Sequence, residues 1–89
     1  MISKELTIIN KLGLHARAAA KLVSLASTFD ADIRVAKDGK TVNGKSIMGV
    51  MMLAASQNSN ITITADGNDE QAAITGLEAL VADRFGEDS

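Results

Sequence analysis

The chain contains one histidine, His15, directly before a helix-favouring segment over residues 16–20, Ala-Arg-Ala-Ala-Ala. The first N–H groups of a helix are unpaired, and together with the helix dipole they stabilise an anion bound at the helix N-terminus. A neutral imidazole is a nucleophile near neutral pH, and its tip becomes anionic once it has accepted a phosphoryl group. Arg17 could donate hydrogen bonds to the phosphoryl oxygens, and Gly13 would let the backbone come close. The pattern is compatible with a phosphoryl-accepting histidine.

The same residues also permit a structural interpretation, in which His15 only caps the helix and Arg17 is a solvated side chain. No acidic partner for the imidazole can be identified from the sequence, so a catalytic triad is not supported. A small hydrolase that uses His15 as a base would have neither a nucleophile nor a metal partner. The motif needs support from the rest of the chain.

A second segment of chemical interest begins at Ser46, which precedes the apolar run over residues 47–55. Serine is a preferred N-cap residue, and a cap contributes about 1 kcal/mol to helix stability. A phosphate on a capping serine would lie at a helix N-terminus, where its charge is tolerated. Ser46 is therefore predicted to be a cap and is also a candidate phosphorylation site.

The helix that Ser46 would begin is rich in methionine. Its apolar side chains can either pack in the core or, for Met48 and Met51 in particular, form an exposed patch that adapts to unlike partners. Lys11, Lys21 and Lys45 could surround that patch and attract acidic partners, or simply be solvated. We assign a partner-binding role to Ala16, Ala20, Lys45, Ile47, Met48 and Met51.

Hydrophobic periodicity predicts the elements that must position these groups. Alternation predicts strands over residues 4–9, 32–37, 40–43 and 61–65, with Asp38-Gly39 as a hairpin turn. Helical spacing predicts helices over residues 16–27, 47–53 and from about 70 onward. The order is β-α-β-β-α-β-α, and because the strands are apolar on one face only, we expect helices on one face of the sheet and water on the other. The tail over residues 86–89 is expected to fray.

Composition excludes several classes of function. The 89 residues include no cysteine and one histidine, which excludes disulfides, thiolate metal sites and His-rich metal sites. A net charge of −2 gives no reason to expect a nucleic-acid partner. No apolar run reaches the roughly 18 residues of a membrane span, and the start does not read as a signal peptide. We expect a cytoplasmic protein with one domain over residues 1–89 and, with few aromatics, a core of Ala, Ile, Leu, Val and Met.

Two segments resemble a known family. Residues 13–19, Gly-Leu-His-Ala-Arg-Ala-Ala, resemble the phosphorylation-site motif of HPr, the histidine phosphocarrier of the phosphoenolpyruvate-dependent sugar phosphotransferase system. Residues 45–51, Lys-Ser-Ile-Met-Gly-Val-Met, resemble the HPr regulatory segment, whose serine is a target of HPr kinase/phosphorylase. The resemblance covers essentially the whole chain and implies an α+β fold. That fold is an open-faced β-sandwich, with a four-stranded antiparallel sheet covered on one face by three helices.

The resemblance also implies roles. His15 would accept a phosphoryl group from phosphorylated enzyme I and pass it to an EIIA protein or domain, with help from Arg17. Ser46 would be the regulatory site. Such a carrier is a substrate and product of enzymes rather than a stand-alone catalyst, and the resemblance implies no cofactor. A docking surface that must stay free favours a monomer.

The chain departs from the family pattern at two positions, and two alternatives stay open. Ala18 stands where the family usually has proline, and it keeps the helix while adding an N–H group. Leu12 stands where a small polar residue is common, and it offers no hydrogen bond to the ring. The nitrogen-related carrier NPr fits the His15 segment equally well, whereas the Ser46 segment favours HPr. The element order alone also allows a ferredoxin-like regulatory binding module.

Overall fold

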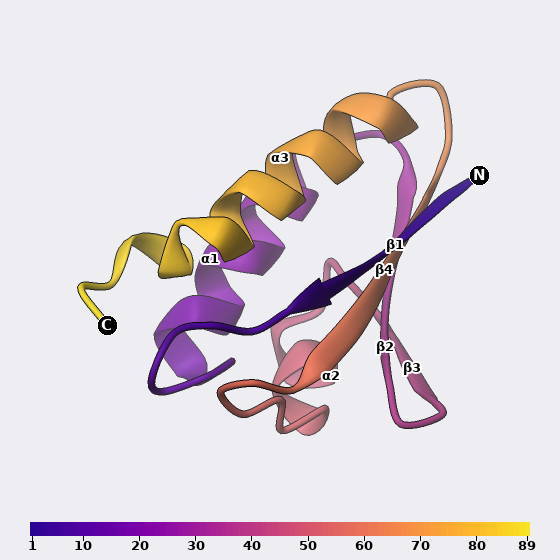
Figure 1. Cartoon of the computed structure of the whole chain (residues 1–89). Helices are drawn as coiled ribbons and strands as arrows, with labels where there is room; N and C mark the ends of the chain where they lie inside the picture. Colours follow the sequence, from indigo (N-terminus) through magenta and orange to yellow (C-terminus); the bar gives the residue numbers. More distant parts are fainter.

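Four strands form one antiparallel sheet in the computed structural model, which describes residues 1–89, and three helices lie against that sheet (Figure 1). The strands are β1 (Ile2–Thr7), β2 (Asp32–Lys37), β3 (Lys40–Asn43) and β4 (Asn60–Asp66). The helices are α1 (Ala16–Ala26), α2 (Ile47–Met52) and α3 (Glu70–Ala82), and a short 3-10 turn, η1 (Arg84–Gly86), follows α3. The predicted element order and the open-faced β-sandwich are confirmed.

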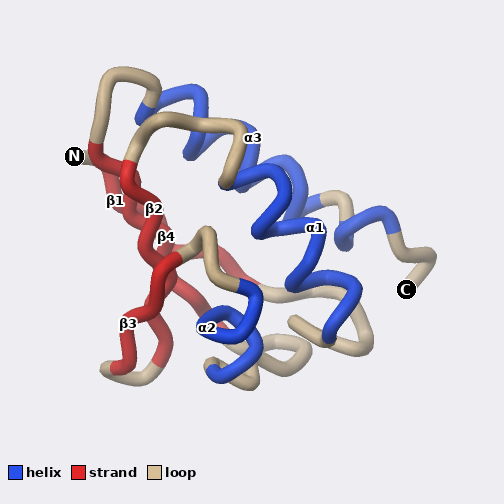
Figure 2. The backbone as a smooth tube through the Cα atoms, turned by 180° about the vertical axis from the view of Figure 1, so that it is seen from behind, coloured by secondary structure: helices blue, strands red, loops and turns tan.

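The strand order is β1-β4-β2-β3, so β4 lies in the middle of the sheet and pairs with both β1 and β2. Strands β2 and β3 form the predicted hairpin. Asp38 and Gly39 in its turn have φ values of 51° and 82°, as a two-residue turn with two left-handed residues requires. Figure 2 shows the strands as one layer and the helices as a second layer on one side of it.

The core lies between these layers and contains 21 buried apolar residues. Strand residues of alternating position, such as Ile33, Val35, Ile61 and Ile63, point into it, as the period of two requires. The helices contribute these buried residues: Ala18, Ala19, Leu22, Val23 and Ala26 from α1, and Ala73, Ile74, Leu77 and Val81 from α3.

The prediction of a methionine-containing core without aromatics is wrong. Phe85 is fully buried and is the largest side chain with no exposed surface, whereas all four methionines are exposed. Three of them lie in α2, whose six residues bury only Val50, so Met48, Met51 and Met52 stay on the solvent side. The aromatic residue at the other end of the chain fills the core instead.

The first strand is displaced from its predicted range of residues 4–9. β1 spans Ile2–Thr7, and Ile8 is fully buried although it lies past the end of the strand. The backbone of Ile8 is paired instead with the loop before β4, through Ser59 and Asn58. None of the helices is both long enough and apolar enough to cross a bilayer.

Candidate functional site

His15 occupies the N-cap position of α1. Its backbone is extended, with φ −72° and ψ 178°, and its carbonyl accepts the first intrahelical hydrogen bond, from Ala19 N at 2.8 Å. The side chain makes no capping hydrogen bond to the helix, so neither ring nitrogen is bound by the N–H groups of the first turn. The ring is 28% exposed and can therefore be reached from solvent.

The loop before His15 is held against the segment that follows α2. Leu14 is buried, and its N–H donates to Ala55 O at 2.8 Å. Gly13 has a φ of 66°, and a Cβ at this position would lie 2.4 Å from Ala55 O and 2.9 Å from Ser56 Cα. Glycine is therefore required both by the left-handed backbone and by the close approach of the two segments.

The tail over residues 86–89 was predicted to fray, and this is wrong for its first half: Gly86 N donates to Asp83 O at 3.0 Å and Glu87 N donates to Arg84 O at 2.9 Å, whereas Asp88 and Ser89 are exposed. Phe85 is buried in the core, and Lys21 Nζ donates to the Phe85 carbonyl at 2.6 Å. Arg84 and Phe85 both have left-handed backbones, with φ 56° and 54°. Non-glycine residues keep such values only where their surroundings enforce them, and here the buried ring and the Lys21 bond do so. The tail is thus fixed beside the first turns of α1.

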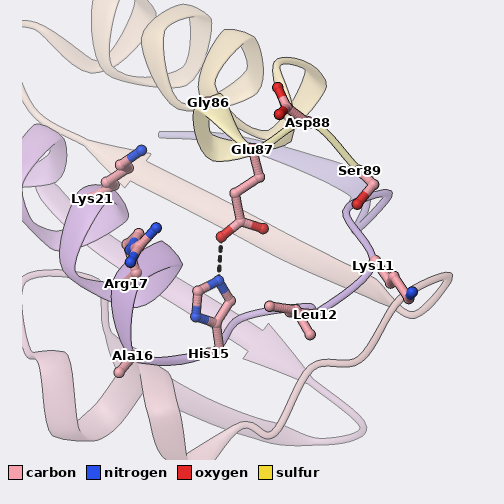
Figure 3. Close-up of a pocket in the computed structure, with 10 residues that line it drawn as sticks. All are labelled: Lys11, Leu12, His15, Ala16, Arg17, Lys21, Gly86, Glu87, Asp88 and Ser89. Atoms are coloured by element: carbon pink, nitrogen blue, oxygen red, sulfur yellow. Dashed lines mark hydrogen bonds and ion pairs between the residues drawn. The ribbon is translucent and has the colours of Figure 1, made fainter.

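The fixed tail brings Glu87 onto the imidazole. Figure 3 shows the Glu87 side chain extending from the tail to the His15 ring, where its Oε2 contacts Nε2. The other carboxylate oxygen accepts from Asn10 Nδ2 at 2.9 Å, and the same Asn10 nitrogen donates to Gly13 O at 2.8 Å. The expectation that His15 has no identifiable acidic partner is therefore corrected: Glu87 is that partner.

The electrostatics of this contact favour a charged carboxylate. The hydrogen bond from Asn10, and then that from His15, hold the pKa of the Glu87 carboxyl below its ordinary value, and the charge of Arg17 acts in the same direction. An ionised carboxylate can only accept hydrogen bonds. In a neutral imidazole the proton therefore lies on Nε2, and the lone pair lies on Nδ1.

The site is an open pocket of about 810 Å³ with a mixed charge. Arg17 and Lys21 line it from α1, Lys11 and Leu12 from the loop, and Glu87 from the tail (Figure 3). Arg17 is exposed, and its guanidinium makes no hydrogen bond within the chain. An unpaired guanidinium beside a nucleophilic ring is suited to binding an incoming phosphoryl group.

Comparison with known proteins assigns the family. The model described as "PTS HPr component phosphorylation site" matches residues 2–83. The chain belongs to the HPr family. The phosphocarrier protein HPr of Cupriavidus necator is 55% identical over 98% of both chains. The crystal structure of HPr-C-His from Thermoanaerobacter tengcongensis superposes with a TM-score of 0.96 at 47% identity, covering 100% of each chain. A curated NPr from Shewanella violacea is 43% identical over 99% of this chain and 97% of its own.

Family membership makes this chain an HPr-type phosphocarrier of the phosphotransferase system, as the two motifs predicted. The family match contains the His15 and Ser46 segments but ends before Glu87. Sequence reasoning missed Glu87 because it lies 72 positions from His15, and no periodic pattern links a tail carboxylate to a loop histidine.

The second segment of this HPr-family chain has the predicted cap. Ser46 Oγ accepts from Gly49 N at 3.1 Å at the start of α2, and the serine is half-buried. Among the residues assigned to partner binding, Ala16 is exposed and Ala20 is half-buried. The α2 patch is exposed as well, with Met48 at 72%, and consists of Ile47, Met48, Met51 and Met52.

The lysines divide into two groups. Lys45 is half-buried, and its ammonium donates to Phe29 O at 2.7 Å, while Lys21 is similarly bound to Phe85 O. Lys11 is exposed and lines the His15 pocket (Figure 3). Two of the three lysines are therefore engaged with the chain itself, and Lys11 is the one whose ammonium makes no hydrogen bond within it.

Proposed function

We propose that this protein accepts a phosphoryl group on His15 from phosphorylated enzyme I and passes it to an EIIA protein or domain. The observation that carries the proposal is the single histidine at the N-cap of α1, with Nε2 engaged by Glu87 and Nδ1 left with its lone pair. Nδ1 would attack the phosphorus, and the bond from phosphorus to the donor would break. The ring keeps its Nε2 proton throughout, so the step needs no base.

The surroundings of His15 suit the product of that step. The N–H groups in the first turn of α1 have no intrahelical acceptor. Together with the positive end of the helix dipole, they would stabilise the negative charge of a phosphoryl group on the ring. Arg17 would bind the phosphoryl oxygens, because its guanidinium is exposed and unpaired. Ala18 contributes one more N–H to this turn than proline would.

A labelling experiment tests the function. The protein is incubated with phosphoenolpyruvate, magnesium and enzyme I, and the product is examined for an acid-labile, alkali-stable phosphate. We expect one phosphate per chain and none on His15→Ala, provided that the circular dichroism spectrum of the variant is unchanged. Label retained on His15→Ala would contradict the assignment. Transfer onward is tested by adding EIIA and following loss of the label.

Ser46 is proposed as a regulatory phosphorylation site for an HPr kinase/phosphorylase. The support is its position as the half-buried N-cap of α2, next to the exposed side chains of Met48 and Met51. A phosphate there would add negative charge to the proposed docking surface and oppose an acidic partner. Incubation with such a kinase and ATP should label the wild type but not Ser46→Ala, and equal labelling of both would contradict this role.

The remaining finer assignments rest on family membership. We propose that the docking surface consists of the α2 patch with Ala16, Ala20 and Lys45, and that the protein acts as a cytoplasmic monomer. A role in the nitrogen branch is the second candidate, favoured by the identity to NPr. Rates of labelling by the sugar-branch and nitrogen-branch donor enzymes, measured side by side, separate the two.

A further inference from the structure

The contacts around His15 form a continuous chain of three side chains from two distant parts of the sequence. Asn10 Nδ2 donates to Glu87 Oε1, and Glu87 Oε2 contacts His15 Nε2. Asn10 and His15 come from the loop before α1, whereas Glu87 comes from the tail beyond η1. Glu87 also lies outside the residues 2–83 that match the family model.

We propose that Glu87 is a positioning residue for phosphoryl transfer, whose carboxylate holds the His15 ring in the Nε2–H tautomer and faces the positive charge that the ring gains. This inference rests on the proposed function of His15 as the phosphoryl acceptor. It assigns a role to the C-terminal tail, which the two sequence motifs do not contain.

The orientation of the Asn10 amide supports this role. Both of its partners, the Gly13 carbonyl and the Glu87 carboxylate, can only accept, so the amide nitrogen must face them. The residue is fully buried, and its Oδ1 has no hydrogen-bond partner. Burying an amide that is satisfied at one end only is costly. In this structure the buried Asn10 amide nitrogen binds both the Glu87 carboxylate and the Gly13 carbonyl, and it therefore holds the tail carboxylate and the loop before His15 together.

The anchoring of the tail also supports a positioning role for Glu87. Phe85, two residues before Glu87, is buried in the core, and its carbonyl is bound by Lys21. The Glu87 side chain is itself only 14% exposed. A carboxylate that is held at both of its oxygens, on a backbone that is anchored just before it, has little freedom, which is what positioning of a second side chain demands.

The charge balance of transfer explains why a carboxylate suits this place. The lone pair of Nδ1 forms the new bond to phosphorus. At the same time the bond between phosphorus and the phosphoryl donor breaks. The ring then carries a formal positive charge while Nε2 keeps its proton. The Glu87 carboxylate faces that Nε2–H and stabilises the charge, as the aspartate of a Ser-His-Asp triad does for its imidazolium. On transfer to the next acceptor, the N–P electrons return to the ring and the charge disappears.

The opposite possibility is that the tail obstructs His15, so that Glu87 must leave before a partner docks. The two possibilities predict opposite effects of removing the charge. An orienting carboxylate makes transfer slower when it is lost, whereas an obstructing carboxylate makes transfer faster.

The test compares Glu87→Gln with Asp83→Asn, which removes one exposed carboxylate from the same end of the chain and leaves the pocket intact. We expect Glu87→Gln to lower kcat for phosphorylation by enzyme I on the order of tenfold, with KM unchanged. The ¹⁵N chemical shifts of the neutral ring should show less Nε2–H tautomer. Asp83→Asn should match the wild type in both measurements.

Each other result has a defined meaning. A Glu87→Gln variant that equals Asp83→Asn in rate and tautomer overturns the positioning role, and a faster variant shows obstruction instead. Asn10→Ala provides a second route, since it should shift the tautomer in the same direction while Glu87 keeps its charge. If the wild type is not labelled at all, the proposed function fails, and the tautomer measurement still reports on Glu87 independently.

Discussion

The carboxylate of Glu87 lies against Nε2 of His15, although 72 positions separate the two residues in the sequence. The contact exists because Phe85 enters the core and Lys21 binds the tail backbone, so the last residues run beside the start of α1. The His15 imidazole, the Glu87 carboxylate and the N-terminus of α1 therefore meet in one pocket, and each can be varied separately.

Replacing Phe85 by alanine tests whether burial of this ring anchors the tail. The change removes the largest fully buried side chain, and truncation of a buried phenylalanine typically costs about 3–5 kcal/mol. Urea denaturation should show a loss of that order. Phe29→Ala serves as a comparison. Because Phe29 is only partly buried, its truncation should reduce the free energy of unfolding by less. Equal losses would contradict the anchoring role.

Gly13 should tolerate substitution less well than Gly39. Both have left-handed backbones, so alanine at either position introduces strain of about 1–2 kcal/mol. Only at Gly13 would the new Cβ also collide with backbone, 2.4 Å from Ala55 O, whereas nothing lies within 4 Å at Gly39. We expect Gly13→Ala to lower the melting temperature clearly more than Gly39→Ala and to slow phosphorylation of His15. Equal effects would show that the close approach is relaxed in solution.

Acid should release the tail through Glu87. Because the folded-state pKa of this carboxyl is lowered, its stabilising contribution is complete above the unfolded pKa, near 4.3 for glutamate, and is lost as the pH falls through the folded value. Amide hydrogen exchange or NMR shifts of the tail, followed from about pH 6 downward, should show this transition only below about pH 4. The Glu87→Gln tail should lack it.

Ser46 should contribute to stability through its cap. Ser46→Ala removes the bond to Gly49 N and should cost about 1 kcal/mol of unfolding free energy. Aspartate is an equally good cap, so Ser46→Asp should keep most of that stability while adding charge to the proposed docking surface. A large loss with Ser46→Asp would indicate that the helix start does not tolerate an anion.

The α2 patch should be required for docking and dispensable for folding. Met48 is 72% exposed, so Met48→Glu should leave the melting temperature nearly unchanged. It should weaken binding to enzyme I about tenfold, or about 1.4 kcal/mol. Thr41→Glu, on an exposed position of β3, is the matched control. If both variants bind enzyme I equally, the patch is not the docking surface.

The sequence predicts the elements well because their signals are local. The stripe on α1, the hairpin at Asp38-Gly39 and the cap at Ser46 each depend on residues within one or two turns, and the structure has all three. The exposure of the methionines could not be predicted, since α2 has only six residues and its apolar positions cover more than one face.

The acidic partner of His15 could not be predicted for a different reason. It depends on the tail reversing its direction through two left-handed residues, Arg84 and Phe85, neither of which is a glycine or asparagine that would indicate such a turn. The contact also requires that Phe85 be fully buried. The sequence does not indicate which of the two phenylalanines is buried, because this depends on how the whole core packs.

The exposure of every methionine has a consequence for oxidative damage. Oxidation to the sulfoxide converts an apolar side chain into a polar one, which disrupts a core that contains methionine. Here the core contains none, so an oxidant would make the α2 patch polar while Phe85, Leu22 and the buried strand residues keep the fold intact. Oxidised molecules would stay folded, with His15 in place, while the proposed docking surface would lose its apolar character.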